Sequence, residues 1–210
     1  GYSRVFLEQT DFTVLGLDRD PAAIARGEAL QSAFPNRLKL VETCFSGIDS
    51  ALVKADICSE EQMNAGKVVD AVVMDLGVSS FQLDEADRGF SFMHNGPLDM
   101  RMSRSGPSAA DLVAEASEEE LARIFWTYGE EKASRKIARA LVTARKDMPF
   151  TETKQLADAV EAVKPRRPKD RIHPATQVFQ ALRIAVNNEL GEIEMAIATA
   201  AKLLKPGGAL

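Results

Sequence analysis

Short apolar runs alternate with stretches of helical periodicity in the first third of the chain. Residues 13–17 (TVLGL), 38–41 (LKLV) and 70–74 (DAVVM) are predicted strands. Asp20 and Pro21 follow the first run and have the N-cap and first-turn pattern of a helix. Apolar strands that are separated by helices favour an α/β fold with a parallel sheet.

The middle of the chain is helical and polar. Residues 108–163 show no convincing strand, and Ser117 with Glu120 has the spacing of a capping box. Residues 132–145 read as a basic amphipathic helix. This part of the sequence predicts several helices in succession.

A further helix of this region should start at Thr151 or Thr153 and end at Pro165. The next residues, 164–171 (KPRRPKDR), form a basic linker rich in proline. Apolar residues then recur at three-and-four spacing, which predicts one long helix. They are Phe179, Leu182, Val186, Leu190, Ile193, Ile197, Ala201 and Leu204.

Residues 206–208 (PGG) should end this helix, and residues 209–210 should begin another strand. The simplest architecture is an α/β domain that a helical segment interrupts. Residues 1–104 and 172–210 are expected to form the α/β part, and residues 105–171 the insertion.

Composition excludes several classes of protein. Cys44, Cys58, His94 and His173 lack the spacing of a metal site or a disulfide framework. We therefore expect a reducing, cytoplasmic location and no metal. No apolar run is long enough for a transmembrane helix, so no membrane partner is expected. The chain starts at Gly1 without an initiator Met or a signal-peptide pattern, so we expect it to be a fragment or a partly observed chain.

Charge is distributed unevenly. Twelve Lys or Arg and five Asp or Glu lie between residues 132 and 171, although the whole chain has a net charge of −5. Such a segment suits a phosphate backbone. On charge alone, a solvated helical surface explains it better.

Asp18 follows the first predicted strand, where ligands of open α/β sheets bind. A carboxylate there can bind both ribose hydroxyls of a nucleotide-like cofactor. Asp20 is better placed for the helix cap, which leaves Asp18 free for this role. Phe45 lies just past the second predicted strand and could stack on an adenine, although a core aromatic is the commoner case.

Asp75, Ser79 and Ser80 combine a carboxylate and two hydroxyls after the third predicted strand, and could accept hydrogen bonds from an amino group. The alternative for Asp75 is a turn residue. Residues 88–102 (RGFSFMHNGPLDMRM) have no regular periodicity but are too apolar for disorder, which favours a binding loop. His173, at a predicted helix start, has the pattern of a structural histidine. No catalytic triad or Walker loop stands out.

Taken together, five segments resemble the RsmH (MraW) family of ribosomal RNA methyltransferases. They span nearly the whole chain, and the fifteen residues from 88 to 102 are the most specific. The segments are residues 17–21 (LDRDP), 75–83 (DLGVSSFQL), 88–102, 127–131 (TYGEE) and 173–190 (HPATQVFQALRIAVNNEL).

The resemblance implies a class I, Rossmann-like methyltransferase sheet with an inserted all-helical domain for RNA recognition. It implies S-adenosylmethionine as the methyl donor and N4 of a cytidine in the decoding region of 16S ribosomal RNA as the acceptor. The partner is then this RNA or the small ribosomal subunit, with a homodimer as an open question. The family's first strand should precede Gly1, and several strands should follow Leu210.

The resemblance also implies cofactor contacts by position. Gly1 and Tyr2 match the end of the glycine-rich loop, Asp18 the ribose-binding acid and Phe45 the aromatic residue at the adenine. Asp75 and Gln82 match two further cofactor-binding positions.

Methyl transfer from a sulfonium is an in-line displacement, so alignment of the reacting atoms is the main task. A hydrogen-bond acceptor would activate the poorly nucleophilic cytosine amino group, and Asp75, Ser79 or Ser80 could serve. The target base must leave its stack. Phosphate contacts are expected from five residues: Arg166, Arg167, Lys169, Arg171 and His173.

Two other functions are weighed against this reading. A nicotinamide-dependent Rossmann oxidoreductase would also place an acid at position 18, and fold alone does not decide. A non-catalytic RNA-binding module would keep only a vestigial cofactor site. Cofactor binding separates the three functions.

Overall fold

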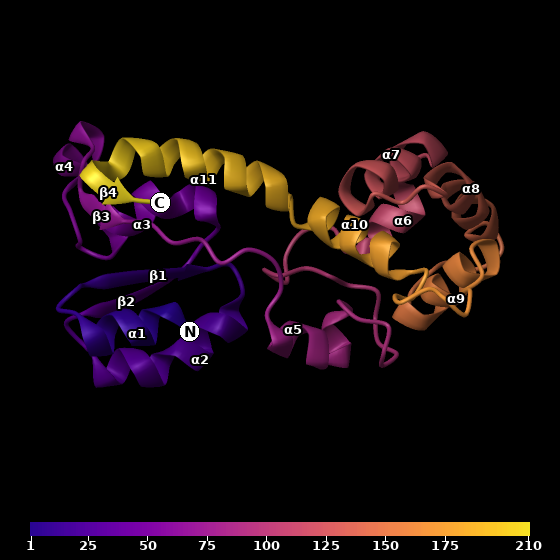
Figure 1. Cartoon of the computed structure of the whole chain (residues 1–210), viewed down its shortest axis with the longest axis horizontal. Coiled ribbons are helices and arrows are strands. Elements are labelled where there is room, and N and C mark those ends of the chain that lie inside the picture. Colours follow the sequence, from indigo (N-terminus) through magenta and orange to yellow (C-terminus); the bar gives the residue numbers. More distant parts are fainter. The chain divides into compact units, whose positions relative to one another are not determined.

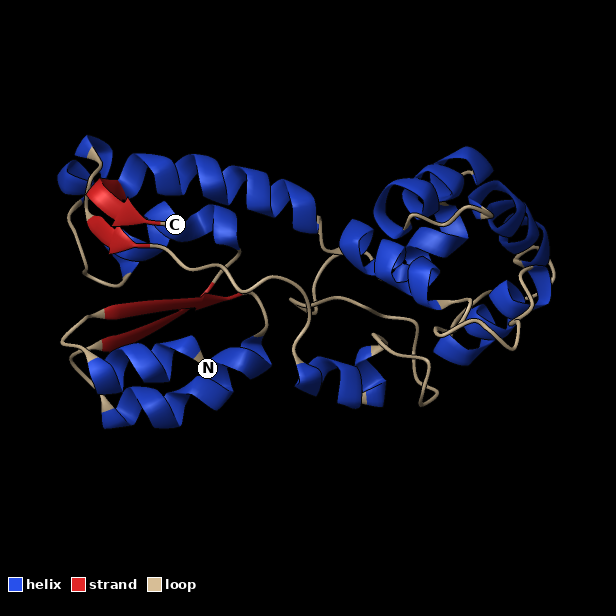
Figure 2. Ribbon diagram, viewed as in Figure 1, coloured by secondary structure: helices blue, strands red, loops and turns tan.

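The computed structural model describes residues 1–210, which fall into two compact units. The first contains residues 1–76 and 190–210, and the second contains residues 77–189. Both strand pairs belong to the first unit, whereas the second consists of helices and loops (Figure 2). The prediction of a mixed α/β protein with parallel strands is confirmed.

In the first unit, β1 (Val14–Asp18) pairs in parallel with β2 (Leu38–Glu42), and α2 (Pro21–Ala33) connects them. The Asp20 side chain caps α2 by accepting a hydrogen bond from the Ala22 amide at 2.9 Å. The two strands and the cap agree with the prediction, because strand, turn and helix signals are all local here.

Helices α1 (Tyr2–Gln9) and α2 lie along one face of the β1–β2 pair (Figure 1). The Arg37 guanidinium ties the end of α1 to the start of β2. It donates to the carbonyls of Leu7 and Phe12, both at 3.1 Å, and to that of Thr10. One side chain thereby satisfies carbonyls that the end of a helix and the following turn leave without partners.

The chain continues through η1 (Phe45–Gly47), α3 (Ile48–Lys54) and α4 (Glu60–Ala65). It then forms β3 (Val69–Ala71), which pairs in parallel with β4 (Leu204–Ala209). The structure thus contains two separate two-stranded sheets.

Two predictions about this second pair need correction. The strand expected at 70–74 is present but covers residues 69–71, and its last register pair is Ala71 with Ala209. Residues 206–208 do not follow the helix as a break but lie within β4. Pro206 is tolerated because it lies in the irregular part of the pairing, between the register pairs Val69–Leu204 and Ala71–Ala209.

The single long helix predicted after residue 174 is also wrong. The structure has α10 (Thr176–Val186) and α11 (Glu189–Leu203), which break at Asn187 and Asn188. Asn188 has a φ of 46°, in the left-handed region that asparagine tolerates better than most residues. The apolar spacing continues across the break, so periodicity alone could not predict where the first helix ends.

The second unit begins with α5 (Ser80–Asp84) and η2 (Ala86–Arg88). An irregular segment leads to four helices that α10 completes. These are α6 (Ala109–Glu115), α7 (Glu118–Gly129), α8 (Ser134–Ala144) and α9 (Thr153–Val163). The prediction that residues 108–163 contain helices and no strand is confirmed.

Ser117 caps α7, as expected, by accepting from the Glu120 amide at 3.1 Å. The cap of α9 is Glu152 instead of Thr151 or Thr153. The Glu152 side chain accepts from the Gln155 amide, which is the part expected of a threonine hydroxyl, and the Gln155 side chain accepts from the amides of Thr151 and Glu152 at 2.9 and 3.1 Å.

The core of the second unit lies between α7 and the helices on both sides of it. Its centre is fully buried and apolar, as the amphipathic patterns of these helices require. The residues are Leu121, Phe125, Ile137, Leu141, Leu156 and Leu182. The irregular segment adds Phe90, Leu98, Met100 and Met102 to the same cluster. No helix of the chain has the length and apolar character that crossing a bilayer requires.

Gly129 marks the closest approach of α7 to α10. A Cβ atom at this position would lie 2.3 Å from the Gln177 carbonyl oxygen and 3.1 Å from the Ala181 Cβ. We expect Gly129→Ala to lower the free energy of unfolding by about 1–3 kcal/mol, because the backbones must separate. Denaturant unfolding measures this, with Thr127→Ala on the exposed face of α7 as the control. Equal stability of both variants would contradict the packing argument.

Candidate functional site

Asp18 and Phe45 lie at the same edge of the first sheet. Asp18 ends β1 opposite Glu42 of β2, and its carbonyl accepts from the Thr43 amide at 3.0 Å. Phe45 follows two residues later in η1, half-buried. The structure therefore brings these two predicted residues to the carboxyl ends of adjacent parallel strands, where α/β proteins bind ligands.

The Asp18 carboxylate is partly withdrawn from water. Burial raises its pKa, against the hydrogen bond that Oδ1 accepts from the Asp20 amide at 2.8 Å. A second hydrogen bond, from the Arg19 amide, and the charge of Arg26 also act to lower the pKa. Asp18 and Ser3 line a cavity of about 210 Å³ together with residues of β1, β2 and α2, among them Leu17 and Ile24.

A contact from the far end of the sequence holds the turn that carries Phe45. The Ser46 amide donates to Oε2 of Glu192 in α11 at 3.0 Å. The remaining predicted residues of this unit lie elsewhere: Gly1 is the N-cap of α1, Tyr2 is exposed at its first position, and Asp75 is exposed after β3.

Ser79, Ser80 and Gln82 lie in the second unit, around the start of α5. The Ser79 hydroxyl accepts from the Gln82 amide at 3.3 Å, and the Gln82 side chain accepts from the Ser79 amide at 3.0 Å. This reciprocal capping box gives Ser79 and Gln82 a structural task. Ser80 is exposed.

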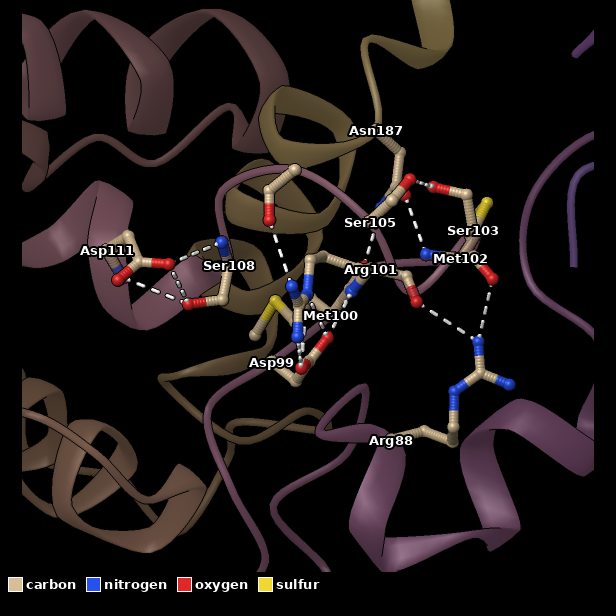
Figure 3. Close-up of polar contacts among 11 residues, drawn as sticks. Arg88, Asp99, Met100, Arg101, Met102, Ser103, Ser105, Ser108, Asp111 and Asn187 are labelled. Carbon is tan, nitrogen blue, oxygen red and sulfur yellow. Dashed lines mark hydrogen bonds and ion pairs between the residues drawn. The ribbon is translucent and has the colours of Figure 1, made fainter.

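Figure 3 shows how the irregular segment after residue 88 is held in shape. The buried Arg88 guanidinium donates to the carbonyls of Arg101 and Met102 at 3.1 and 3.0 Å. Asn187 donates to the Met100 carbonyl at 2.7 Å and accepts from the Met102 amide at 2.9 Å. The Asn187 amide group thus pairs with this backbone much as a neighbouring strand would.

Asp99 and Arg101 form a two-point ion pair at the exposed side of this loop (Figure 3). Arg101 Nη2 lies 2.5 Å from Asp99 Oδ2, and Nε lies 3.0 Å from Oδ1. Arg101 also donates to the Gly106 carbonyl at 2.9 Å. Partial burial raises the pKa of Asp99, but the Arg101 hydrogen bonds outweigh it and hold the pKa below its ordinary value of 3.8.

This ion pair predicts a dependence of stability on pH. A lowered carboxyl pKa adds stability above the unfolded-state pKa, and acid removes it as the pH falls through the lowered pKa. We therefore expect the melting temperature to fall with acid below about pH 4, and Asp99→Asn to flatten that fall. Thermal unfolding between pH 2 and 7 measures this. An equally steep fall in the variant would contradict the assignment.

Sequence reasoning missed Arg88, Asp99, Arg101 and Asn187 as members of one network. The available signals were the Asn187–Asn188 pair inside a helical pattern and the charges within an otherwise apolar segment. Asn187 lies 85 and 87 residues from the backbone groups it contacts, so neighbouring residues could not reveal these partners.

The basic segment divides into cations that the fold uses and cations that it leaves exposed. Intramolecular contacts occupy Lys136, Arg139, Arg145, Lys154 and Lys164. The predicted residues Arg166, Arg167, Lys169 and Arg171 are exposed, and their side chains form no ion pair. His173 is half-buried, and its Nε2 lies 3.4 Å from Glu161 Oε2.

Comparisons with known proteins find the same family over the whole length of the chain. The family model of the MraW methylase family matches residues 1–210. The chain is 53% identical, over 210 residues, to proteins named ribosomal RNA small subunit methyltransferase H from Brucella suis, Brucella canis and Brucella melitensis. The alignment covers 100% of this chain and 58% of each relative, so the chain spans little more than half of their length. The chain belongs to the MraW methylase family.

Proposed function

We propose that the protein containing this chain transfers a methyl group from S-adenosylmethionine to N4 of a cytidine in the decoding region of 16S ribosomal RNA. The match to a methylase family over every residue carries this proposal. The relatives' name adds the small-subunit ribosomal RNA as the substrate class. The 16S RNA or the small subunit is the corresponding partner, in the cytoplasm.

We also propose a class I, Rossmann-like arrangement for the α/β part, residues 1–104 and 172–210. Parallel β1 and β2, with α2 crossing between them, support it. The proposed insertion, residues 105–171, lies inside the compact second unit and contains only helices and loops. A helical insertion is suited to RNA recognition because it carries the basic segment.

The edge at Asp18 and Phe45 fits the cofactor. The half-buried Asp18 carboxylate, at the end of its strand, can accept hydrogen bonds from ribose hydroxyls, and the half-buried Phe45 ring offers a stacking face for adenine. Gly1, Tyr2, Asp75 and Gln82 are the further contacts we propose. When bound, the cofactor supplies an electrophilic methyl group on a sulfonium.

The residues of the chain then have to orient the base and assist its amino nitrogen. The nitrogen lone pair is delocalised into the cytosine ring, so an acceptor at the amino hydrogens stabilises the positive charge that develops there. We propose Asp75 as this acceptor. It is exposed, whereas the Ser79 hydroxyl oxygen already accepts a capping hydrogen bond. Ser80 is the second choice.

Asp75→Ala is expected to lower kcat about 100-fold at saturating cofactor, because the acceptor is lost. Exposed Asp84, in α5, provides the matched control through Asp84→Ala. Single-turnover methyl transfer with a separate measurement of cofactor affinity distinguishes the two roles. Loss of affinity with unchanged turnover would leave Asp75 as a cofactor contact only.

The function is tested with the protein in its full natural length, small ribosomal subunits and methyl-labelled S-adenosylmethionine. Digested RNA is separated into nucleosides. Label in N4-methylcytidine is the expected result. Label in another nucleoside would overturn the acceptor atom, and absence of label with intact RNA binding would favour the non-catalytic binding module.

A further inference from the structure

The basic linker between α9 and α10 is held at both of its ends. Here "basic loop" denotes residues 165–172, with Lys164 and His173 as its flanking residues. Four exposed cations stand within it: Arg166, Arg167, Lys169 and Arg171. A linker that only connects two helices would need no contacts to hold its conformation. The contacts at the ends and in the middle of this one therefore suggest a binding role.

Lys164 is the first anchor. Its Nζ lies 2.7 Å from Glu131 Oε2 and 3.1 Å from Gln177 Oε1. Glu131 is fully buried, and its other oxygen accepts from the Ala133 amide at 2.8 Å. This carboxylate is therefore satisfied on both sides, and it fixes Lys164 between the α7–α8 turn and α10.

His173 is the second anchor. Its Nδ1 accepts from the Ala175 amide at 3.1 Å, and its Nε2 faces Glu161 Oε2 at 3.4 Å. The imidazole centroid lies 4.7 Å from that of Phe92, which packs edge-on against Phe179 at 4.8 Å. The ring is thus engaged by both nitrogens and one face, which leaves little of it for a ligand.

The middle of the basic loop is also shaped. The Asp170 carboxylate accepts from the Arg167 amide at 2.8 Å, and the Asp170 amide donates to the Arg167 carbonyl at 2.9 Å. Pro165 and Pro168 fix φ at two more positions. The backbone that carries these cations therefore has little conformational freedom left to lose when a ligand binds.

We infer that the basic loop is a pre-ordered binding site for the RNA phosphate backbone. Arg166, Arg167, Lys169 and Arg171 contact phosphates, and Lys164 and His173 are positioning residues that hold the loop. The inference rests on the proposed function for its substrate and assigns one task to the four cations of the loop and another to its two flanking residues. It moves His173 from the expected RNA contacts to the anchors.

The salt dependence of RNA binding separates the two tasks. Each phosphate contact contributes about 0.7 to the slope of log K against log salt for single-stranded RNA. We expect the triple variant Arg166→Gln, Arg167→Gln, Lys169→Gln to lower that slope by about 2. The probe is an RNA oligonucleotide from the decoding region, bound to the full-length protein. Lys146→Gln, at an exposed basic residue outside the loop, is the control.

Removing an anchor should have a different signature. The double variant Glu131→Gln, Lys164→Gln avoids leaving one charge buried alone. We expect its RNA affinity to fall about 3- to 10-fold because the loop must be ordered on binding, with an unchanged salt slope. Cleavage by trypsin after Arg166 and Arg171 should become faster. His173→Ala, at the other end, should behave in the same way.

Three outcomes would overturn the inference. An unchanged slope in the triple variant would exclude the loop as the phosphate site. A slope lowered by both the triple variant and the double variant Glu131→Gln, Lys164→Gln would make Lys164 a contact. Unchanged trypsin cleavage in both anchor variants would show that the loop does not depend on its anchors. Methyl transfer by the unmodified protein is measured in parallel, so failure of the proposed function is recognised independently.

Discussion

Asp18→Asn is expected to weaken S-adenosylmethionine binding about 10- to 100-fold, since hydrogen bonds to a charged acceptor are lost. The asparagine oxygen can still accept from the Asp20 amide, so the turn into α2 should persist. Calorimetric titration of the full-length protein measures the affinity. Glu42→Gln, at the register partner of Asp18, is the matched control.

The same residue predicts how cofactor affinity responds to acid. Burial raises the pKa of Asp18, so the carboxylate is neutralised at a higher pH than an exposed aspartate would be. Affinity should therefore decline with acid earlier than in a protein that uses an exposed carboxylate, and Asp18→Asn should remove this decline. Full affinity in the asparagine variant would refute the ribose-binding role.

Asn187→Ala should lower the free energy of unfolding of the second unit by about 3 kcal/mol, because buried groups lose their partners. The side chain bonds the Met100 carbonyl, the Met102 amide and the Arg183 carbonyl, at 2.7–2.9 Å. No water can readily replace it, since Asn187 is only 2% exposed.

Asn188→Gly is the control for this change. Asn188 is exposed and has a positive φ, which glycine adopts without strain, so the variant should be as stable as the parent or slightly more stable. Thermal unfolding followed by circular dichroism compares the two variants. Similar losses in both would show that the helix break, and not the amide network, determines stability here.

Local patterns predicted local structure well. The cap at Asp20, the strands β1 and β2, the succession of helices after residue 108 and the edge shared by Asp18 and Phe45 all follow from neighbouring residues. The basic linker was also visible as a run of charges. In each case the physical cause, whether a cap, an apolar alternation or a strand end, acts over a few positions.

Contacts between distant residues were beyond the reach of the same patterns. The Lys164–Glu131 ion pair spans 33 residues, and the bonds of Asn187 to Met100 and Met102 span more than 80. Neither contact produces a periodic pattern in the sequence. The helix breaks at Asn187, although the apolar spacing continues into α11. The expected RNA role of His173 likewise took no account of Glu161 and Phe92, which only the fold brings to the ring.

Absence of helix or strand does not make residues 98–102 mobile. The Leu98 amide donates to the Thr151 carbonyl at 2.9 Å, the Met100 amide to the Arg88 carbonyl at 3.1 Å and the Met102 amide to Asn187. Met100 is fully buried. The amide hydrogens of this segment should therefore exchange with solvent as slowly as those of the core helices, and open only when the second unit unfolds as a whole.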